Sequence, residues 1–322
     1  VRAGQGLAWD GFRRTDVGGA DGASSAAVAP DGSFVLAGTA SLVLGDGGRM
    51  NGLALARYLP DGAPDPAFGA GGSTVAFVAG FVIGVVDAAF LPDGHIVVAG
   101  TLYPQPNPMI ANDLFVARFD AVGRLDLTFG VGGWAHVRNA GWPMEAAGLV
   151  VQPDGTLVVA AEGWNAVDDP RPLYLGLAYI TADGQPVATA GKDGLVRIEI
   201  GRAGSVYDVA PAPDNGVYVA VERSMAYMMP VDWGVLRFGA DGKPDPTFAG
   251  GGLSAVRLDL ERDPRALVDD AHGDAPARPR RLDRVRDEVV EHLGHARAVA
   301  PEVVDGLRGG FELDAPLRGA RP

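Results

Sequence analysis

The sequence predicts an all-β protein built from four copies of one antiparallel sheet, and two series of tight turns carry this prediction. The first series has steps of 62, 61 and 60 residues between its aspartates and comprises Pro30-Asp31-Gly32, Pro92-Asp93-Gly94, Pro153-Asp154-Gly155 and Pro213-Asp214-Asn215-Gly216. The second has steps of 61, 61 and 58 residues and comprises Asp61-Gly62, Val122-Gly123, Asp183-Gly184 and Asp241-Gly242. A fixed period of this length indicates stacked supersecondary units.

The second copy shows how one unit is built. Residues 85–91 form a mostly apolar strand that runs into the turn at Pro92, and the β-branched run 95–101 completes a hairpin. A longer polar loop leads to a third strand at 114–119, and a fourth strand follows a second tight turn at 134–138. Four antiparallel strands with two tight turns and two longer connections are typical of one blade of a β-propeller.

This unit divides the chain into a β-propeller-type array over 1–260 and a non-repeat tail over 261–322. We expect four blades, at about 19–78, 79–138, 139–200 and 201–260. Residues 10–17 match the fourth strand of a unit that lacks its other strands, so they predict one leading outer strand. Because the last blade has a fourth strand of its own, this surplus strand indicates either an open arc or a protein with more blades.

The tail departs from the repeat. Glycine becomes sparse, and residues 281–298 space their apolar side chains as a helix does. We expect a short segment that is α-helical or disordered. A shift of reading frame in a GC-rich gene is the alternative, because a repeat array rarely ends in mid-repeat without a capping unit.

Composition excludes several classes of function. The formal charge of −13 makes the protein acidic, and a field of this sign repels the phosphates of nucleic acid. The absence of cysteine excludes a disulfide framework, a thiolate metal site and a cysteine nucleophile. The longest uncharged apolar stretch, at 75–86, is shorter than the roughly 20 residues that cross a bilayer. The first residues lack the apolar core of a signal peptide.

A second pattern lies on the third strand and the turn that follows it. In three copies an arginine precedes an aspartate by eight residues, and a phenylalanine follows that aspartate by three: Arg57, Asp65 and Phe68; Arg118, Asp126 and Phe129; Arg237, Asp245 and Phe248. The third copy has Tyr179, Val187 and Ala190 at these places, so it loses all three together. We expect an Arg–Asp pair across the hairpin, with the phenylalanine filling the gap between adjacent blades. Cation binding by these aspartates is the alternative, although the turn lacks the ligand density of a calcium loop.

These linked motifs resemble the delta-60 repeat family, a β-propeller domain of unknown function in bacterial surface and secreted proteins. The resemblance rests on the Pro-Asp-Gly turn, on Val-Leu-Ala-Gly at 35–38 or Val-Val-Ala-Gly at 97–100, and on Ala54-Leu55-Ala56-Arg57-Tyr58. It extends to Asp65-Pro66-Ala67-Phe68-Gly69-Ala70-Gly71-Gly72 and to 237–248, and it covers roughly residues 10–260. It implies a propeller-like array and brings no catalytic residues with it.

Candidate ligand-binding residues lie in loops that open on one face of a propeller. They combine aromatic, methionine, amide and carboxylate side chains: Tyr103, Trp142, Trp164, Asn165, Asp168, Asp169, Tyr227 and Met229. A concave face with aromatic side chains and a few polar groups suits a glycan, a peptide or a protein partner. The alternative is that each side chain packs its own loop.

The sequence offers no catalytic residue and implies no cofactor. There is no Gly-x-Ser-x-Gly motif, and His95 and His136 have no partner evident in the sequence, which favours exposed surface positions. The inner strands offer Asp87 and Asp208 as weak metal candidates, and two acids alone make a poor cage for a metal ion.

These observations predict a non-enzymatic binding or scaffold module that is extracellular or at the cell surface. A propeller enzyme of the metal-dependent hydrolase or lactonase type, with a central site, is one alternative. The other is a structural repeat fragment that assembles through exposed sheet edges.

Overall fold

The computed structural model describes residues 20–43, 49–105, 112–138, 143–164, 172–201, 203–224, 232–250 and 253–256. The chain divides into two compact units, Val1–Ala277 and Arg278–Pro322, and all described residues belong to the first. The expected leading strand at 10–17 and the tail at 261–322 lie outside the described residues.

The described part of the chain forms four antiparallel sheets of four strands, each in sequence order. Sheet 1 comprises β1 (Ala20–Val28), β2 (Phe34–Val43), β3 (Arg49–Tyr58) and β4 (Ser73–Ala76). Sheet 2 comprises β5 (Phe81–Phe90), β6 (Ile96–Pro104), β7 (Asp113–Phe119) and β8 (Trp134–Val137). Sheet 3 comprises β9 (Met144–Val151), β10 (Leu157–Trp164), β11 (Leu173–Ile180) and β12 (Leu195–Gly201). Sheet 4 comprises β13 (Ala203–Ala212), β14 (Gly216–Ser224), β15 (Asp232–Phe238) and β16 (Leu253–Val256).

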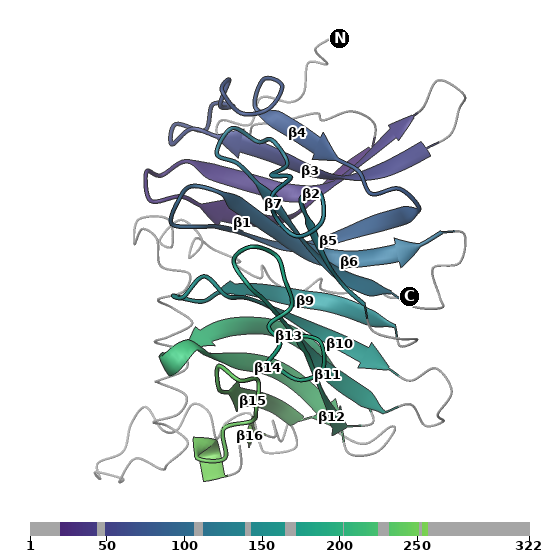
Figure 1. Ribbon diagram of the computed structural model, residues 1–322, viewed down its shortest axis with the longest axis vertical. Coiled ribbons are helices and arrows are strands. Elements are labelled where there is room, and N and C mark those ends of the chain that lie inside the picture. Colours follow the sequence, from purple (N-terminus) through teal and green to yellow (C-terminus); the bar gives the residue numbers. More distant parts are fainter. Residues whose placement is uncertain are drawn as a thin grey trace, which may run out of the picture. The chain divides into compact units, whose positions relative to one another are not determined.

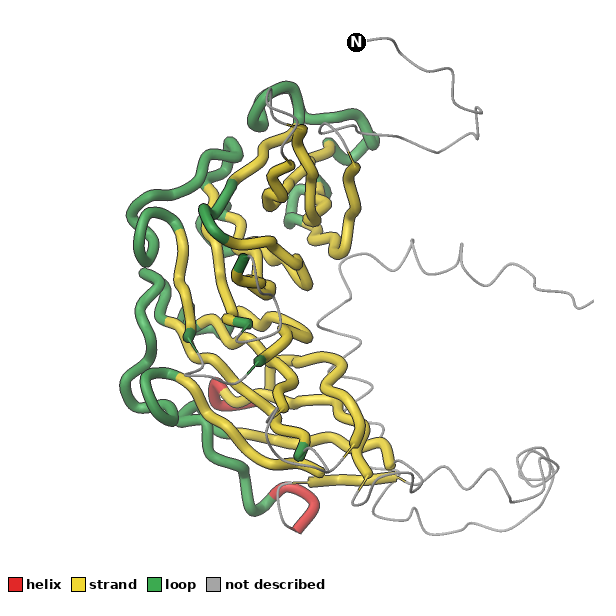
Figure 2. The backbone as a smooth tube through the Cα atoms, turned by 90° about the vertical axis from the view of Figure 1, so that its right-hand side faces the viewer, coloured by secondary structure: helices red, strands yellow, loops and turns green. Residues whose placement is uncertain are grey.

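The predicted all-β, propeller-type fold class is therefore confirmed. Figure 1 shows the four sheets following one another in chain order, and Figure 2 shows the described turns gathered along one side of them. The described helical segments are two short 3₁₀ turns, η1 (Pro213–Asn215) and η2 (Phe248–Gly250). None of the described helices is long and apolar enough to cross a membrane.

The Pro-Asp-Gly turns form for a local reason. The aspartate carboxylate accepts a hydrogen bond from the backbone N–H two residues on, as Asp93 does from His95 at 3.0 Å. Gly94 then has a φ of 85°, which is costly for a residue with a side chain. In the fourth copy Asp214 and Asn215 adopt positive φ instead, and both residue types tolerate this conformation.

Each sheet begins with a bulged strand. The pairing of the first and second strands skips one residue per sheet, at Ser24, Val86, Ala147 and Tyr207. A bulge bends its strand and increases the local twist. The same device at the same step in all four copies gives the sheets a common curvature.

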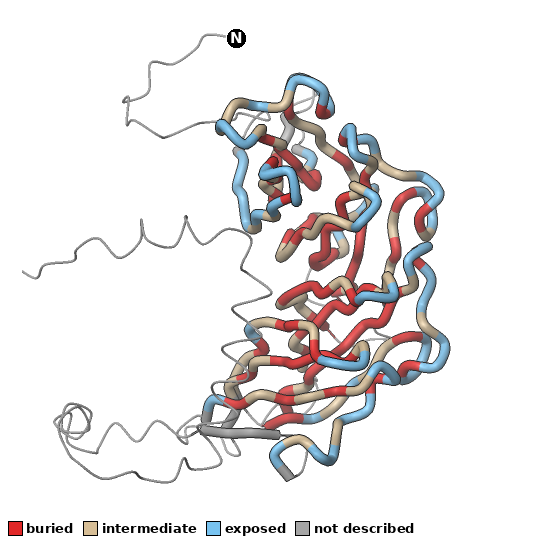
Figure 3. Tube along the Cα trace, turned by 90° about the vertical axis from the view of Figure 1, so that its left-hand side faces the viewer, coloured by how far each residue is buried: buried red, intermediate tan, exposed pale blue. Residues whose placement is uncertain are grey.

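The sheets hold together through their apolar faces. One buried cluster joins sheets 1 and 2, a second joins sheets 2 and 3, and a third joins sheets 3 and 4. In Figure 3 the strands are accordingly buried over much of their length, whereas many of the turns are exposed. Among the described residues, no buried cluster joins sheet 1 to sheet 4. We call the side of a sheet that faces the next sheet along the chain its leading face, and the opposite side its trailing face.

The arginine and aspartate of the repeat meet across the hairpin after the third strand. Arg118 Nε donates to Asp126 Oδ2 at 2.7 Å, Arg57 Nε lies 3.4 Å from Asp65 Oδ2, and Arg237 pairs with Asp245. Burial by itself raises the pKa of Asp126, but hydrogen bonds from Thr128 and Arg118 outweigh it and lower that pKa. The arginine also reaches the next sheet, where Nη1 of Arg118 donates to the Ala182 carbonyl at 2.5 Å. Nη1 of Arg57 donates to the Ala121 carbonyl at 2.8 Å.

The phenylalanine of the repeat lies against a glycine of the next sheet. A Cβ atom at Gly123 would lie 2.9 Å from the ring of Phe68, and one at Gly184 would lie 3.1 Å from the ring of Phe129. Both rings are fully buried. These glycines are thus required twice, since they also have a positive φ.

The third copy fills the same space with other side chains. A Cβ atom at Gly242 would lie 2.5 Å from Val196 and 3.1 Å from the ring of Tyr179. The Tyr179 hydroxyl donates to the Gly239 carbonyl of sheet 4 at 3.5 Å. Tyr179 thus makes the hydrogen bond to the next sheet that the arginine makes in other copies. Together with Val196 it also fills the space that the phenylalanine fills there.

Breaking one Arg–Asp pair should destabilise the array. We expect Arg118→Met to lower the free energy of unfolding by about 2 kcal/mol, because it leaves the half-buried Asp126 carboxylate without its charged donor. Chemical denaturation monitored by tryptophan fluorescence measures this change. The double variant Arg118→Met/Asp126→Leu should cost less than the single one, and a double variant that costs as much as both single changes added would show that the pair is not coupled.

Candidate ligand-binding face

Two of the predicted ligand-face residues lie at equivalent points of adjacent sheets. Tyr103 is near the end of β6 and Trp164 ends β10, and each lies seven residues after the first residue of its strand. Both side chains are partly buried. By strand alternation Tyr103 lies on the leading face of sheet 2, as Ala99 does, and Trp164 lies on the leading face of sheet 3, as Ala160 does. The other predicted ligand-face residues lie outside the described residues: Trp142, Asn165, Asp168, Asp169, Tyr227 and Met229.

The structure adds two carboxylates that the sequence analysis missed. Glu145 on β9 and Glu162 on β10 are direct register partners, and both are partly buried. Like charges directly opposite each other destabilise a sheet. Burial and the charge of Glu162 raise the pKa of Glu145. The sequence does contain one indication of this site, because Glu162 directly follows the apolar run 157–161 at a position where alternation would place a buried apolar residue.

Glu162 also connects two sheets. Its Oε2 accepts a hydrogen bond from the backbone N–H of Val206 at 3.1 Å, so its charge is held at the border of sheets 3 and 4. The charged neighbour that acts on Glu145 is Glu162, its register partner. The two carboxylates therefore differ, since one is anchored to the backbone and the other is opposed by its partner.

Tyr103 lies near Glu145 of this pair. Its ring lies over Gly84, where a Cβ atom would be 3.0 Å from the ring. Burial and the charge of Glu145 raise the pKa of the Tyr103 hydroxyl. Two residues before it, Thr101 accepts a hydrogen bond from the backbone N–H of Ala146 at 2.9 Å, which fixes the end of β6 against β9. Tyr103 and Glu145 are thus close enough to interact electrostatically where sheets 2 and 3 meet, and Glu145 in turn lies opposite Glu162 within sheet 3.

The border of sheet 4 carries a further aromatic residue. Tyr207 occupies the bulge of β13 with 58% of its surface exposed, and its hydroxyl donates to Glu222 on β14. This hydrogen bond, together with burial and the charge of Glu222, raises the pKa of Tyr207. The sequence analysis missed Tyr207 because a bulge position is not evident from alternation.

The weak metal candidates have other contacts. Asp87 accepts hydrogen bonds from the Ser25 hydroxyl at 2.8 Å and from the Leu149 backbone N–H at 3.2 Å, so it ties β5 to the first strands of both neighbouring sheets. Asp208 accepts from the Val209 N–H at 2.8 Å and lies against Gly148. Over the described ranges, no group of three or more histidine, aspartate or glutamate side chains is placed to hold a metal ion.

The histidines have partners that the sequence did not reveal. His136 Nε2 lies 2.7 Å from Asp113 Oδ2 on the neighbouring strand, and His95 Nδ1 lies 3.1 Å from Asp93 Oδ1. His95 and His136 are partly buried, with 30% and 26% of their side chains exposed. Both histidines are therefore more buried than the expected exposed surface positions, and turn geometry and strand pairing bring an aspartate to each.

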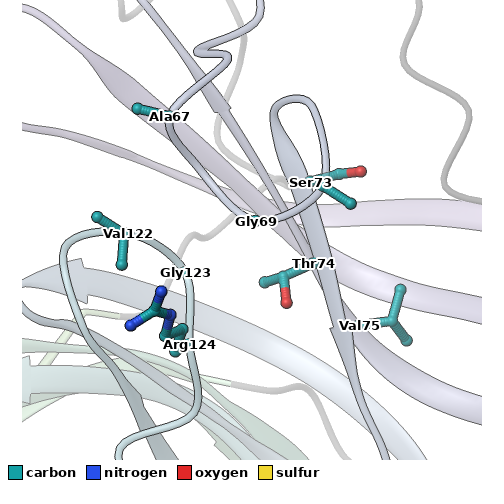
Figure 4. A pocket seen from close by; sticks show the side chains of 9 residues that line it. Ala67, Gly69, Ser73, Thr74, Val75, Val122, Gly123 and Arg124 are labelled. Atoms are coloured by element: carbon teal, nitrogen blue, oxygen red, sulfur yellow. The ribbon is translucent and has the colours of Figure 1, made fainter.

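A separate pocket lies between β4 with its preceding turn in sheet 1 and the turn after β7 in sheet 2 (Figure 4). It is lined by Ala67, Gly69, Ala70, Ser73, Thr74, Val75, Val122, Gly123 and Arg124. The same turns make the contact between sheets, where the Gly69 N–H donates to the Val122 carbonyl at 2.8 Å. We regard this pocket as part of the packing of the two sheets.

Three segments of the chain match a known protein family. Residues 29–68, 91–129 and 212–248 match the model of a family described as a domain of unknown function (DUF5122) β-propeller. The chain carries this delta-60 type repeat. The matched segments are the copies with the Arg–Asp–Phe pattern, and the copy that lost the pattern lies between them. The resemblance seen in the sequence is thus confirmed.

Two solved structures show a distant likeness to this chain. Sucrose-6-phosphate hydrolase from Lactobacillus gasseri shares 13% identity at a TM-score of 0.35, over 68% of this chain and 49% of that one. The chain therefore spans about half the length of the hydrolase. A gluconolactonase from Xanthomonas campestris shares 13% identity at a TM-score of 0.28, over 70% of this chain and 75% of that one. No curated protein matches the sequence.

Removing the charge of Glu145 should stabilise the protein at neutral pH. Its raised pKa means that ionisation costs more in the folded chain than in the unfolded one, so this cost appears as the pH rises through the raised pKa. We expect Glu145→Gln to raise the free energy of unfolding at pH 7 by up to about 1 kcal/mol, and the gain to disappear below about pH 4, where the carboxyl is protonated in both states.

Thermal unfolding followed by circular dichroism between pH 3.5 and 8 measures this gain. Glu162→Gln is the matched comparison, and its gain should be smaller because it weakens the hydrogen bond from Val206. A Glu145→Gln variant with the melting temperature of the parent at pH 7 would contradict the interpretation.

Proposed function

We propose that the protein is a non-enzymatic binding module whose ligand contacts the aromatic and acidic cluster at the ends of β6 and β10. One observation carries the proposal: Glu145 lies close enough to act electrostatically on both Tyr103 of sheet 2 and its register partner Glu162, and all three side chains remain partly exposed. A cluster that only stabilised the fold would gain from apolar residues here, because opposed like charges cost stability. Retaining them is consistent with a ligand that supplies the missing counterpart.

The ligand is one that donates hydrogen bonds. Carboxylates accept, and a half-buried carboxylate binds hydroxyl or ammonium donors more strongly than neutral acceptors do. The flat ring of Tyr103, which is fixed over Gly84, adds a stacking surface. A glycan with several hydroxyl groups fits both features. A peptide with lysine or arginine side chains fits the carboxylates and the formal charge of −13.

We further propose that the module acts outside the cell or at its surface. The resemblance of the repeats to those of bacterial surface and secreted proteins supports this location.

A glycan array and a panel of lysine- and arginine-containing peptides test the proposed function, followed by isothermal titration of any ligand found. Tyr103→Ala and Glu162→Gln should each weaken binding about tenfold or more, equivalent to at least about 1.4 kcal/mol. Leu127→Ser is the control, because Leu127 is 70% exposed in the loop before β8. If the parent, Tyr103→Ala and Glu162→Gln bound the ligand with equal affinity, the ligand would bind elsewhere. If neither the glycan array nor the peptide panel gave a binding signal, the proposed ligand classes would be contradicted.

A further inference from the structure

The leading face of sheet 4 exposes positions that are buried on the leading faces of the other three sheets. The residue five places before the end of the third strand is buried on the leading face of sheets 1, 2 and 3: Leu53, Leu114 and Leu175, with 0%, 1% and 1% exposed. In sheet 4 this residue is Trp233, and 59% of it is exposed. An exposed tryptophan at a position that is otherwise buried indicates a face that lacks its neighbour.

The Arg–Asp–Phe unit of sheet 4 shows the same difference. The rings of Phe68 and Phe129 are fully buried under the next sheet, whereas Phe248 is only partly buried. The arginines of sheets 1 and 2 donate to a carbonyl of the next sheet. The contacts that the structure gives Arg237 are with Asp245 and with the ring of Tyr218, and both partners belong to sheet 4. Sheet 4 therefore has the arginine donor of this contact, but no carbonyl of another sheet is given as its acceptor among the described residues.

Sheet 1 presents the matching acceptor half. Gly62 occupies the place of Gly123, Gly184 and Gly242, each of which has a side chain of the preceding sheet within 3.1 Å of its Cβ position. No described atom lies within 4 Å of that position at Gly62. On the trailing face of sheet 1, Val28 is 48% exposed where Phe90 packs into the cluster between sheets 1 and 2. Sheet 1 therefore has the turn and the face that contact a preceding sheet in the other copies, but no described sheet covers them.

We propose that a second copy of this chain docks here, with the leading face of sheet 4 in one copy against the trailing face of sheet 1 in the other. By analogy with the contacts between sheets 1, 2 and 3, Phe248 packs under Gly62 of the second copy and Arg237 donates to its Pro60 carbonyl. The Ala249 N–H donates to its Asp61 carbonyl. This contact continues the internal interfaces of the chain, so the partner is specified by the chain's own repeat.

The same contact made twice closes a dimer. A head-to-tail interface produces a ring whenever its rotation closes, and two copies of a four-sheet array contribute eight sheets. Propellers typically contain four to eight blades. This assembly differs from the pairing of sheet edges, since it buries sheet faces and leaves the outer strands free. It is also independent of the aromatic and acidic cluster that we propose for ligand binding.

Cysteine crosslinking tests the proposal directly, because the chain has no cysteine of its own. The Gly69 N–H lies 2.8 Å from the Val122 carbonyl, which brings the two backbones within disulfide range, and Ala249 and Asp61 are the equivalent residues of the proposed contact. An oxidised mixture of Ala249→Cys and Asp61→Cys should give a covalent dimer on a non-reducing gel. A mixture of Ala249→Cys and Leu127→Cys is the control and should give none.

The double variant Ala249→Cys/Asp61→Cys distinguishes the occupant. Covalent dimers support the proposal. A covalently closed monomer would overturn it, because sheet 4 would then contact sheet 1 of its own chain. Absence of any bridge would also overturn it, because another segment would then cover these faces.

The molar mass in solution gives a second measurement. Light scattering should give twice the 33.2 kDa of the chain for the parent protein and for Leu127→Glu. Trp233→Glu and Val28→Glu, each on one half of the contact, should reduce it to the mass of one chain while circular dichroism stays unchanged. A parent protein that remains monomeric at 100 µM, or a dimer that survives both changes, would overturn the proposal.

Discussion

The contact between one sheet and the turn of the next is the interaction on which the described structure depends. Each sheet is apolar on its faces and cannot cover them itself, so its stability comes from its neighbours. The repeat secures this contact with an arginine that reaches a carbonyl of the next sheet and a phenylalanine that packs under a glycine there. The third copy shows that the requirement is geometric, since Tyr179 and Val196 satisfy it with different chemistry.

The candidate ligand-binding face sits where this regular packing is interrupted. At the ends of β6 and β10 the alternation of apolar residues gives way to Thr101, Tyr103 and Glu162. Thr101 and Glu162 are tied to the neighbouring sheets by hydrogen bonds from the N–H groups of Ala146 and Val206, and the ring of Tyr103 lies over Gly84 of its own sheet. These contacts limit the side-chain freedom of the polar groups, which favours binding because less freedom remains to be lost.

The sequence could propose candidate residues that depend on position along a repeat. Tyr103 and Trp164 were proposed because the loops of a propeller can be located from its turns. Glu145 was missed because its importance comes from Glu162, its register partner across the sheet, and pairing is not evident from one strand alone. Tyr207 was missed because it occupies a bulge, which shifts a residue out of the alternation. The aspartate partners of His95 and His136 were missed for the same reason as Glu145, since they are supplied by a turn and by a neighbouring strand.

The sequence by itself determined the period, the all-β class and the order of the strands, because turn chemistry and apolar alternation are local properties of the chain. It also paired the arginines with their aspartates, since both lie on one hairpin. Only the tertiary structure decided what lies between sheets: the carbonyls that Arg57 and Arg118 reach, and the glycines that lie against Phe68 and Phe129. These contacts join residues about sixty positions apart, and their geometry depends on the twist and spacing of whole sheets, which no local pattern encodes.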